Sequence, residues 1–88
     1  MPRAPRPIEE RPPVLLTFGR AVRQVRKNRG FSQEAFADLC GIDHSYMGCV
    51  ERGESNLALV NIEKIVRALN MPLSEFFKFV DASSDVQN

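Results

Sequence analysis

Cysteine and histidine are the residue types in this chain best suited to metal binding or nucleophilic chemistry. The sequence holds two cysteines and one histidine, and they lie close together as Cys40, His44 and Cys49. A structural zinc site needs four ligands in a tetrahedral arrangement. Only three candidates are present here, and Cys40 belongs to an apolar run that we expect to face a core. We therefore predict no metal site.

Catalysis has equally little support from these residues. His44 could act as a general base only beside a nucleophile and an orienting acid, and a chain of 88 residues has little room for a substrate pocket. Cys49 is expected to be exposed, but no strongly electropositive segment adjoins it, so a redox role is the less favoured alternative. We predict a protein that is not an enzyme and that binds no cofactor and no small-molecule ligand.

Charge along the chain is uneven, although the net charge is only +1. Residues 14–40 contain five basic and two acidic residues, a balance of +3, whereas residues 41–55 contain one basic and three acidic residues, a balance of −2. The basic part could follow a phosphate backbone, or it could be a solvated helix face. The sequence has neither a secretory signal nor the roughly 20 apolar residues of a membrane span, which predicts a cytoplasmic protein without membrane association.

Five helices are predicted from the spacing of the apolar residues and from the residue types that start and end helices. Side-chain caps are expected at Ser32, Asp43 and Ser74, and glycine ends at Gly30, Gly41 and Gly53. The expected buried faces consist of Leu15, Phe18, Val22, Val25, Phe36, Ala37, Leu39, Cys40, Ile42, Met47, Val50, Leu59, Ile62, Ile65, Val66 and Leu69.

Composition divides the chain into three parts. Residues 1–13 contain five prolines and three arginines, which predicts a flexible N-terminal arm. Residues 14–80 are expected to form one compact all-α domain of five helices. Residues 81–88 are polar and are expected to form a loose tail.

The link between the second and third expected helices consists of Gly41-Ile42-Asp43 alone. A three-residue link that begins with glycine makes two helices cross at a steep angle, which is the helix-turn-helix arrangement. Gly41 would adopt the left-handed conformation in the turn. Ala37 is small enough to lie where the third helix crosses the second. The segment therefore predicts a helix-turn-helix.

This segment, "FSQEAFADLCGIDHSYMGCVERGE", resembles the helix-turn-helix of the phage repressor and Cro family, also called the XRE family. The resemblance extends from about Leu15 to Phe77. The part "VERGESNLALVNIEKIVRAL" is also similar to the controller proteins of restriction–modification systems, which belong to the same family. The resemblance implies a compact five-helix lambda-repressor-like domain that binds double-stranded DNA.

The resemblance also implies roles for particular residues. His44, Ser45 and Cys49 match the positions that read base edges in the major groove. Phosphate contacts are implied for Gln33, Arg26, Arg52, Ser55 and Asn56. Arg26 and Glu51 match a family pair that ties the first helix to the third, and as a surface ion pair it would contribute about 0–1 kcal/mol.

Some positions depart from the family pattern. The base-reading set lacks an arginine or lysine that could read guanine, so the operator sequence is not predicted. Ala58 stands where the family usually has a serine or threonine cap for the fourth helix. Gly48 weakens the third helix by about 1 kcal/mol, which we interpret as room for a close approach to the sugar-phosphate wall.

The fifth expected helix is unusually apolar. Four large apolar side chains occur within five positions, at Phe76, Phe77, Phe79 and Val80. A short helix can turn two of them toward a core but not all four, so the cluster indicates an interface. We predict a homodimer through this helix, because a two-fold dimer places two recognition helices about 34 Å apart, one turn of DNA.

These features predict a sequence-specific transcriptional regulator that binds a palindromic operator as a homodimer, with a restriction–modification controller as the favoured subtype. A phage-type repressor and an antitoxin are alternatives that the chain does not separate. An alternative from another class is a protein-interaction module on the same scaffold that has lost DNA binding. The modest net charge and the missing base-reading arginine favour that module slightly.

Overall fold

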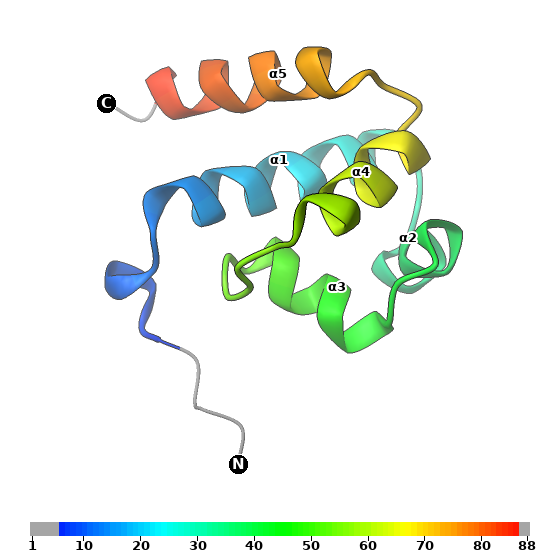
Figure 1. Cartoon of the computed structure of the whole chain (residues 1–88), viewed down its shortest axis with the longest axis horizontal. Helices are drawn as coiled ribbons and strands as arrows, with labels where there is room; N and C mark the ends of the chain where they lie inside the picture. The colour runs from blue at the N-terminus through cyan, green and yellow to red at the C-terminus, as the bar shows by residue number, and fades with distance from the viewer. Residues whose placement is uncertain (1–5, 87–88) are drawn as a thin grey trace.

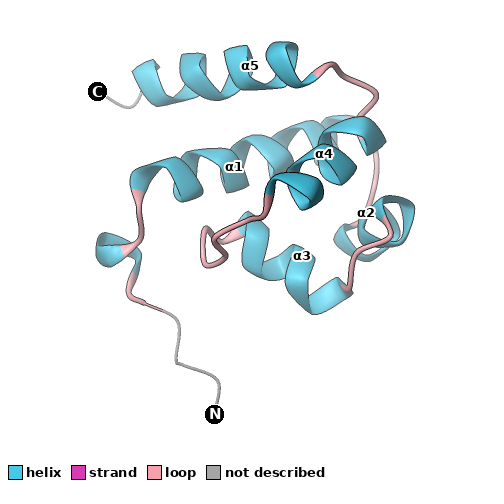
Figure 2. Cartoon of the chain, in the orientation of Figure 1, coloured by secondary structure: helices cyan, strands magenta, loops and turns pink. Residues whose placement is uncertain are grey.

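The computed structural model describes the backbone of residues 6–86, and within that range it contains helices and loops but no strand (Figure 2). The elements are the 3-10 helix η1 (Ile8–Glu10) and the α-helices α1 (Pro13–Asn28), α2 (Gln33–Cys40), α3 (His44–Glu51), α4 (Leu59–Ala68) and α5 (Leu73–Val86). In Figure 1, α5 lies on one side of α1, and α2 and α3 lie on the other. The predicted all-α fold of five helices is confirmed.

The first helix, α1, runs through the middle of the domain. Pro13 occupies its first position, where a missing N–H breaks no hydrogen bond. Phe18 and Val22 turn into the core, and Gly30 ends the helix with a φ of +81°. Gly19 lies against α3, and a Cβ built on it would stand 2.4 Å from the carbonyl oxygen of Val50. The two helix backbones therefore touch at Gly19.

The helix-turn-helix is formed by α2 and α3. The Oγ of Ser32 accepts the N–H of Ala35 at 3.0 Å, and the carboxylate of Asp43 accepts the N–H of Ser45 at 2.9 Å. Between the two caps Gly41 has a φ of +71°, which a residue with a Cβ rarely adopts. Both predicted caps and the left-handed turn are confirmed.

The core draws side chains from all five α-helices. Phe76 of α5 packs edge-to-face on Phe18 of α1, with ring centroids 5.5 Å apart. Burial of one large apolar side chain contributes about 1.5–3 kcal/mol. The buried apolar residues are Phe18, Ala21, Val22, Phe36, Ala37, Cys40, Met47, Val50, Ile65, Val66, Leu69, Phe76 and Val80.

Two residues of the predicted buried faces are exposed instead. Leu39 is 55% exposed and Leu59 is 71% exposed. Only eight residues form α2, and Phe36 and Cys40 occupy its inward side. Leu59 is the first residue of α4, and the side chains that reach the core begin with the half-buried Ile62. The predictions for Leu39 and Leu59 are therefore wrong.

The fifth helix differs from its prediction at both ends. It begins at Leu73, so Ser74 lies inside the helix and does not cap it from outside. It continues to Val86, so residues 81–86 are helical rather than a loose tail. Polar residues on a helix that already packs through Phe76 and Val80 can extend it into solvent.

The N-terminal arm contains a short 3-10 helix and contacts the domain. Residues 6–12, here called the N-terminal strap, include η1 and pack against the end of α3 through Arg11. Its guanidinium donates to the carbonyl oxygen of Arg52 at 2.8 Å. The flexibility of residues 1–13 stays a prediction, and residues 1–5 lie outside the described residues.

Candidate nucleic-acid interface

The outward side of α3 carries the three side chains that the family resemblance assigned to base reading. His44 and Ser45 lie in the first turn and are exposed, and Cys49 lies one turn further along and is half-buried. The opposite side of the helix packs inward, with Met47 0% and Val50 1% exposed. Because Ser45 and Cys49 are four residues apart, they share one face of the helix. The fold therefore presents this face of α3 to a partner.

The imidazole of His44 lies between two carboxylates of α2. Its Nε2 lies 2.8 Å from Oδ1 of Asp38, and its Nδ1 lies 3.9 Å from Oε2 of Glu34. The hydrogen bond with Asp38 raises the pKa of His44 above its ordinary value, with smaller contributions from the charges of Asp38, Glu34 and Asp43. A protonated His44 offsets negative charge at the start of α3. The sequence did not predict this pairing, and base reading by His44 remains a prediction.

The predicted clasp between Arg26 and Glu51 is present as a buried, bidentate pair. Nε of Arg26 lies 2.6 Å from Oε2 of Glu51, and Nη2 donates to Oε1 at 2.9 Å. Nη1 donates to the carbonyl oxygen of Phe31 at 2.9 Å. The two residues are only 6% and 8% exposed, so the expectation of a weak surface pair is wrong. Loss of one partner from a buried pair costs about 3–5 kcal/mol.

The burial of Arg26 also corrects its second assignment. Its guanidinium is committed to Glu51 and Phe31, and 7% of its side chain is exposed. A direct phosphate contact by Arg26 is therefore not supported. The Arg26 side chain instead lines a hollow, where it neutralises the charge of Glu51.

This hollow, here called the phosphate hollow, lies where α1, the start of α2 and the end of α3 meet. Its volume is about 430 Å³, and it is lined by Arg23, Arg26, Gln33, Glu51 and Arg52. Nε2 of Gln33 donates to Oε1 of Glu51 at 3.0 Å, which fixes the amide at the first position of α2. A helix start also attracts anions through its free N–H groups. The hollow thus combines basic side chains, an oriented amide and a helix N-terminus.

Arg52 directly follows α3, and its side chain lines the hollow. Its Nε lies 2.9 Å from Oε2 of Glu54, and its side chain is 56% exposed. The hydrogen bond with Glu54 raises the pKa of Arg52 and lowers the pKa of Glu54. In the adjoining loop Ser55 is half-buried and Asn56 is exposed. Arg52 and Asn56 are therefore accessible, as their predicted phosphate contacts require.

The structure gives Gly48 a different role from the predicted one. Gly48 is buried, and a Cβ built on it would stand 3.0 Å from Nη1 of Arg52 and 3.5 Å from Oε1 of Gln33. The space above this glycine therefore accommodates two side chains of the protein itself. The interpretation that Gly48 admits the sugar-phosphate wall directly is not supported.

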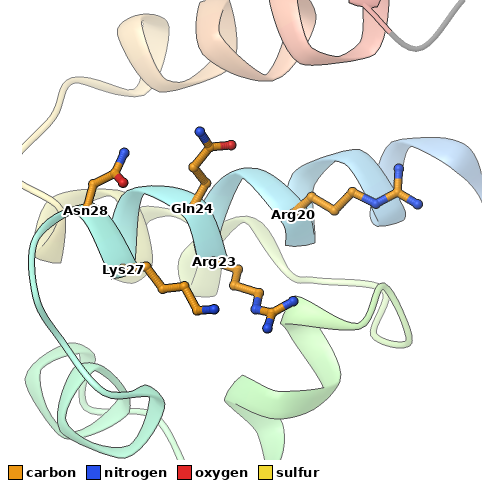
Figure 3. A pocket seen from close by; sticks show the side chains of 5 residues that line it. All are labelled: Arg20, Arg23, Gln24, Lys27 and Asn28. Carbon is orange, nitrogen blue, oxygen red and sulfur yellow. The ribbon is translucent and has the colours of Figure 1, made fainter.

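Arg23 is a residue of this surface that the site assignment from the sequence missed. It lines the phosphate hollow together with Gln33 and Arg52. In Figure 3, Arg23 and Lys27 point from α1 toward the side where α2 and α3 lie, whereas Gln24 and Asn28 point toward α5. The signal was present in the sequence, because Arg23 precedes the clasp residue Arg26 by three positions and so shares its side of the helix.

A second hollow follows the outer side of α1. Its volume is about 300 Å³, and it is lined by Arg20, Arg23, Gln24, Lys27 and Asn28 (Figure 3). Arg20, Arg23 and Lys27 of α1 therefore form an exposed row, and Arg23 in the middle of this row also lines the phosphate hollow.

The aromatic cluster of α5 is divided between the core and the surface. Phe76 is 0% exposed and Val80 is 5% exposed, so these two residues pack inside the chain, and their assignment to a dimer interface is wrong. Phe77 and Phe79 are half-buried. The expectation that two of the four residues face the core is confirmed.

The cysteines differ in environment. Cys40 is buried, and its burial raises the pKa of the thiol to about 11, which keeps it protonated and unreactive. Cys49 is half-buried, with its Sγ 3.7 Å from Nη2 of Arg52. Within the described part of the chain, no three His, Cys, Asp or Glu side chains gather in a way that could hold a metal ion.

None of the described helices has both the length and the apolar character needed to cross a membrane.

Known proteins are similar to this chain in sequence and in fold. Residues 22–76 match the family described as Helix-turn-helix. The control protein C.MunI of a Mycoplasma species is 36% identical over 69 residues, which cover 77% of this chain and 93% of C.MunI. The crystal structure of the restriction–modification controller protein C.AhdI from Aeromonas hydrophila is 47% identical, with a TM-score of 0.68, and the match covers 70% of this chain and 94% of C.AhdI.

A more distant structure shows the same fold. It is the restriction–modification controller protein C.Esp1396I as a tetramer in complex with its natural 35-base-pair operator, with a TM-score of 0.76 and 24% identity over 81% of this chain and 93% of that one. At this identity the likeness concerns the fold alone. The chain belongs to the helix-turn-helix family of the phage repressor and Cro type, and control proteins of restriction–modification systems are among its relatives.

Proposed function

We propose that the protein is a sequence-specific transcriptional regulator that binds a palindromic operator as a homodimer, and that it is the control protein of a restriction–modification system. Its similarity to C.MunI and C.AhdI over nearly their whole lengths supports this subtype. The proposal includes action in the cytoplasm, where bacterial DNA lies, without a membrane, a cofactor or a small-molecule ligand.

The observation that carries the proposal is the phosphate hollow beside the outward face of α3. Arg23 and Arg52 supply positive charge, and Gln33 supplies an amide that Glu51 holds in place. A DNA phosphate in this hollow would also meet the N-terminus of α2. In that position Ser45 and Cys49 would face base edges, with Asn56 near the flanking phosphate.

Self-association is proposed through apolar side chains that the single chain covers only in part or leaves exposed. These are the half-buried Phe77 and Phe79 of α5 and the exposed Leu59 and Val60 at the start of α4. Leu59 and Val60 are 71% and 64% exposed, which is unusual for neighbouring large apolar residues. Sedimentation should show that the wild type forms a dimer and that Val60→Ser dimerises more weakly. If the two proteins dimerise equally, Val60 is not part of the interface.

The decisive test is a footprint on the DNA upstream of the protein's own gene. We expect protection of two half-sites with two-fold symmetry, about one helical turn apart. The logarithm of the binding constant should fall with the logarithm of salt concentration at a slope of about −4 or steeper, because each protomer of a dimer brings at least two cations. Binding that does not weaken with salt would contradict the phosphate contacts.

A protein-interaction module is the second candidate, and the exposed apolar residues of α2 and α4 favour it. Leu39, Leu59 and Val60 are all more than half exposed. If the footprint shows no protected palindrome at low salt while the chain still self-associates, this candidate replaces DNA binding. Phage-type repressor and antitoxin remain alternatives within the DNA-binding class, and the genes next to this one would distinguish them.

A further inference from the structure

The N-terminal strap is held at the end of α3 by Arg11. Nε of Arg11 donates to the carbonyl oxygen of Arg6 at 2.8 Å, and Nη1 donates to the carbonyl oxygen of Arg52 at 2.8 Å. Nη2 lies 3.4 Å from Oε2 of Glu54. One guanidinium thus joins the strap, the residue that follows α3 and the loop beyond it.

Glu54 is shared between two arginines that differ in exposure. Arg11 approaches Oε2, and Arg52 places Nε 2.9 Å from the same oxygen and Nη2 3.3 Å from Oε1. The side chains of Arg11 and Glu54 are 12% and 11% exposed, whereas that of Arg52 is 56% exposed. Arg52 is therefore the member of the trio that is free to turn outward.

A phosphate contact by Arg52 would draw its guanidinium away from Glu54. The carboxylate would then lie, mostly covered, beside negatively charged DNA, and a covered charge without a partner is strongly unfavourable. Arg11 can keep this carboxylate paired, because its bonds to two backbone carbonyls fix it in place.

We propose that Arg11 is a positioning residue for DNA binding, which neutralises Glu54 when Arg52 moves from that carboxylate to a DNA phosphate. The proposal rests on the proposed function. It concerns a part of the chain that the family match, residues 22–76, does not include.

The test is a double-mutant cycle on the Kd for the footprinted operator, measured by fluorescence anisotropy with the full chain. Arg11→Gln should weaken binding about tenfold, equivalent to about 1.4 kcal/mol. Glu54→Gln should bind at least as tightly as the wild type, and adding Arg11→Gln to it should change Kd by less than about twofold. Arg67→Gln removes an exposed arginine of α4 and is the charge-matched control, with Kd within about twofold of the wild type.

A conservative variant separates charge from anchoring. Arg11→Lys keeps the positive charge but loses the fork of donors, so Kd should stay within about threefold of the wild type. If Arg11→Lys and Arg11→Gln weaken binding equally, charge neutralisation is refuted. It is also refuted if Arg11→Gln raises Kd by the same factor in the wild type and in the Glu54→Gln variant. Circular dichroism checks the fold, and if Arg11→Gln does not fold, Arg11→Lys and the double variant carry the test.

The outcomes also separate this proposal from the proposed function. A wild-type protein without a salt-dependent footprint would refute both. Specific binding by the wild type, together with no rescue of Arg11→Gln by Glu54→Gln, would refute only the role of Arg11.

Discussion

Gly19 offers a sharp test of how closely α1 and α3 pack. A Cβ at this position would stand 2.4 Å from the carbonyl oxygen of Val50 and 2.7 Å from that of Glu51. Both neighbours are backbone atoms in a helix, so no change of rotamer can relieve the contact. Gly19→Ala therefore requires the two helices to move apart by about 1 Å, given the normal separation of nonbonded heavy atoms.

The expected loss of stability is the difference between two opposing effects. An added methyl group in a tightly packed interior typically costs about 1–3 kcal/mol, and we take about 3 kcal/mol because the backbone cannot yield locally. Replacing a helical glycine with alanine returns about 1 kcal/mol of helix propensity. The free energy of unfolding should fall by about 2 kcal/mol, which lowers Tm by about 10 °C for a domain of this size.

Gly48→Ala is the matched control for this measurement. Its Cβ would meet the far end of the flexible Arg52 side chain at 3.0 Å, and no backbone atom is among its nearest neighbours. The same gain of about 1 kcal/mol in helix propensity should therefore dominate, and Gly48→Ala should be stable or slightly stabilised. Displacement of the Arg52 guanidinium from the space above this position should nevertheless weaken DNA binding.

Urea unfolding followed by circular dichroism gives both free energies from the midpoint and slope. If Gly19→Ala falls within about 0.5 kcal/mol of the wild type, the helices do not touch as described, and the reasoning is refuted. If both alanine variants lose the same stability, helix packing is not what distinguishes the two glycines.

The remaining predictions concern the clasp, the histidine and the interface. Glu51→Gln should lower the free energy of unfolding by about 3 kcal/mol, because Arg26 would be buried without its partner; a urea midpoint near that of the wild type would contradict this. The pKa of His44 is raised in the folded state, so its pairing with Asp38 stabilises the fold fully at pH values below 6.5, the pKa of the unfolded state. This stabilisation is lost as pH rises through the folded pKa. The urea midpoint should therefore fall as pH rises from below 6.5 in the wild type, and it should fall less in His44→Gln. Gln33→Ala should weaken binding to all DNA sequences alike, whereas Ser45→Ala should change the preferred base pairs by about 1–3 kcal/mol in binding assays on operator variants; identical behaviour of the two would show that phosphate and base contacts are wrongly assigned.

Much of the fold was predictable because its signals are local. The caps at Ser32 and Asp43 and the glycine at Gly41 fix where helices begin and end within a few residues of sequence. The periodicity of apolar residues then gives the inward faces. It failed at Leu39 and Leu59, because periodicity identifies a stripe along a helix but not how far the neighbouring helices extend to cover it.

The features that the sequence did not predict depend on contacts between distant residues. Arg11 meets Arg52 across 41 positions and also pairs with Glu54, so long-range contacts of one side chain attach a proline-rich segment that reads as unstructured. His44 meets Asp38 only because the turn folds α3 back beside α2. The length of α5 beyond Val80 was missed because its added residues are mostly polar and carry no periodic signal.

The outward face of α3 has a consequence for how such a protein could change its target. The side chains that hold α3 in place include Asp43, Tyr46, Met47, Val50 and Glu51, whereas Ser45 is exposed and Cys49 is half-buried. Exchanges at Ser45 would therefore leave folding stability nearly unchanged, and exchanges at the half-buried Cys49 would change it less than exchanges at the fully buried Met47 or Val50. New operator preferences could arise at these two positions, by mutation or by design, on a scaffold that does not need to be rebuilt.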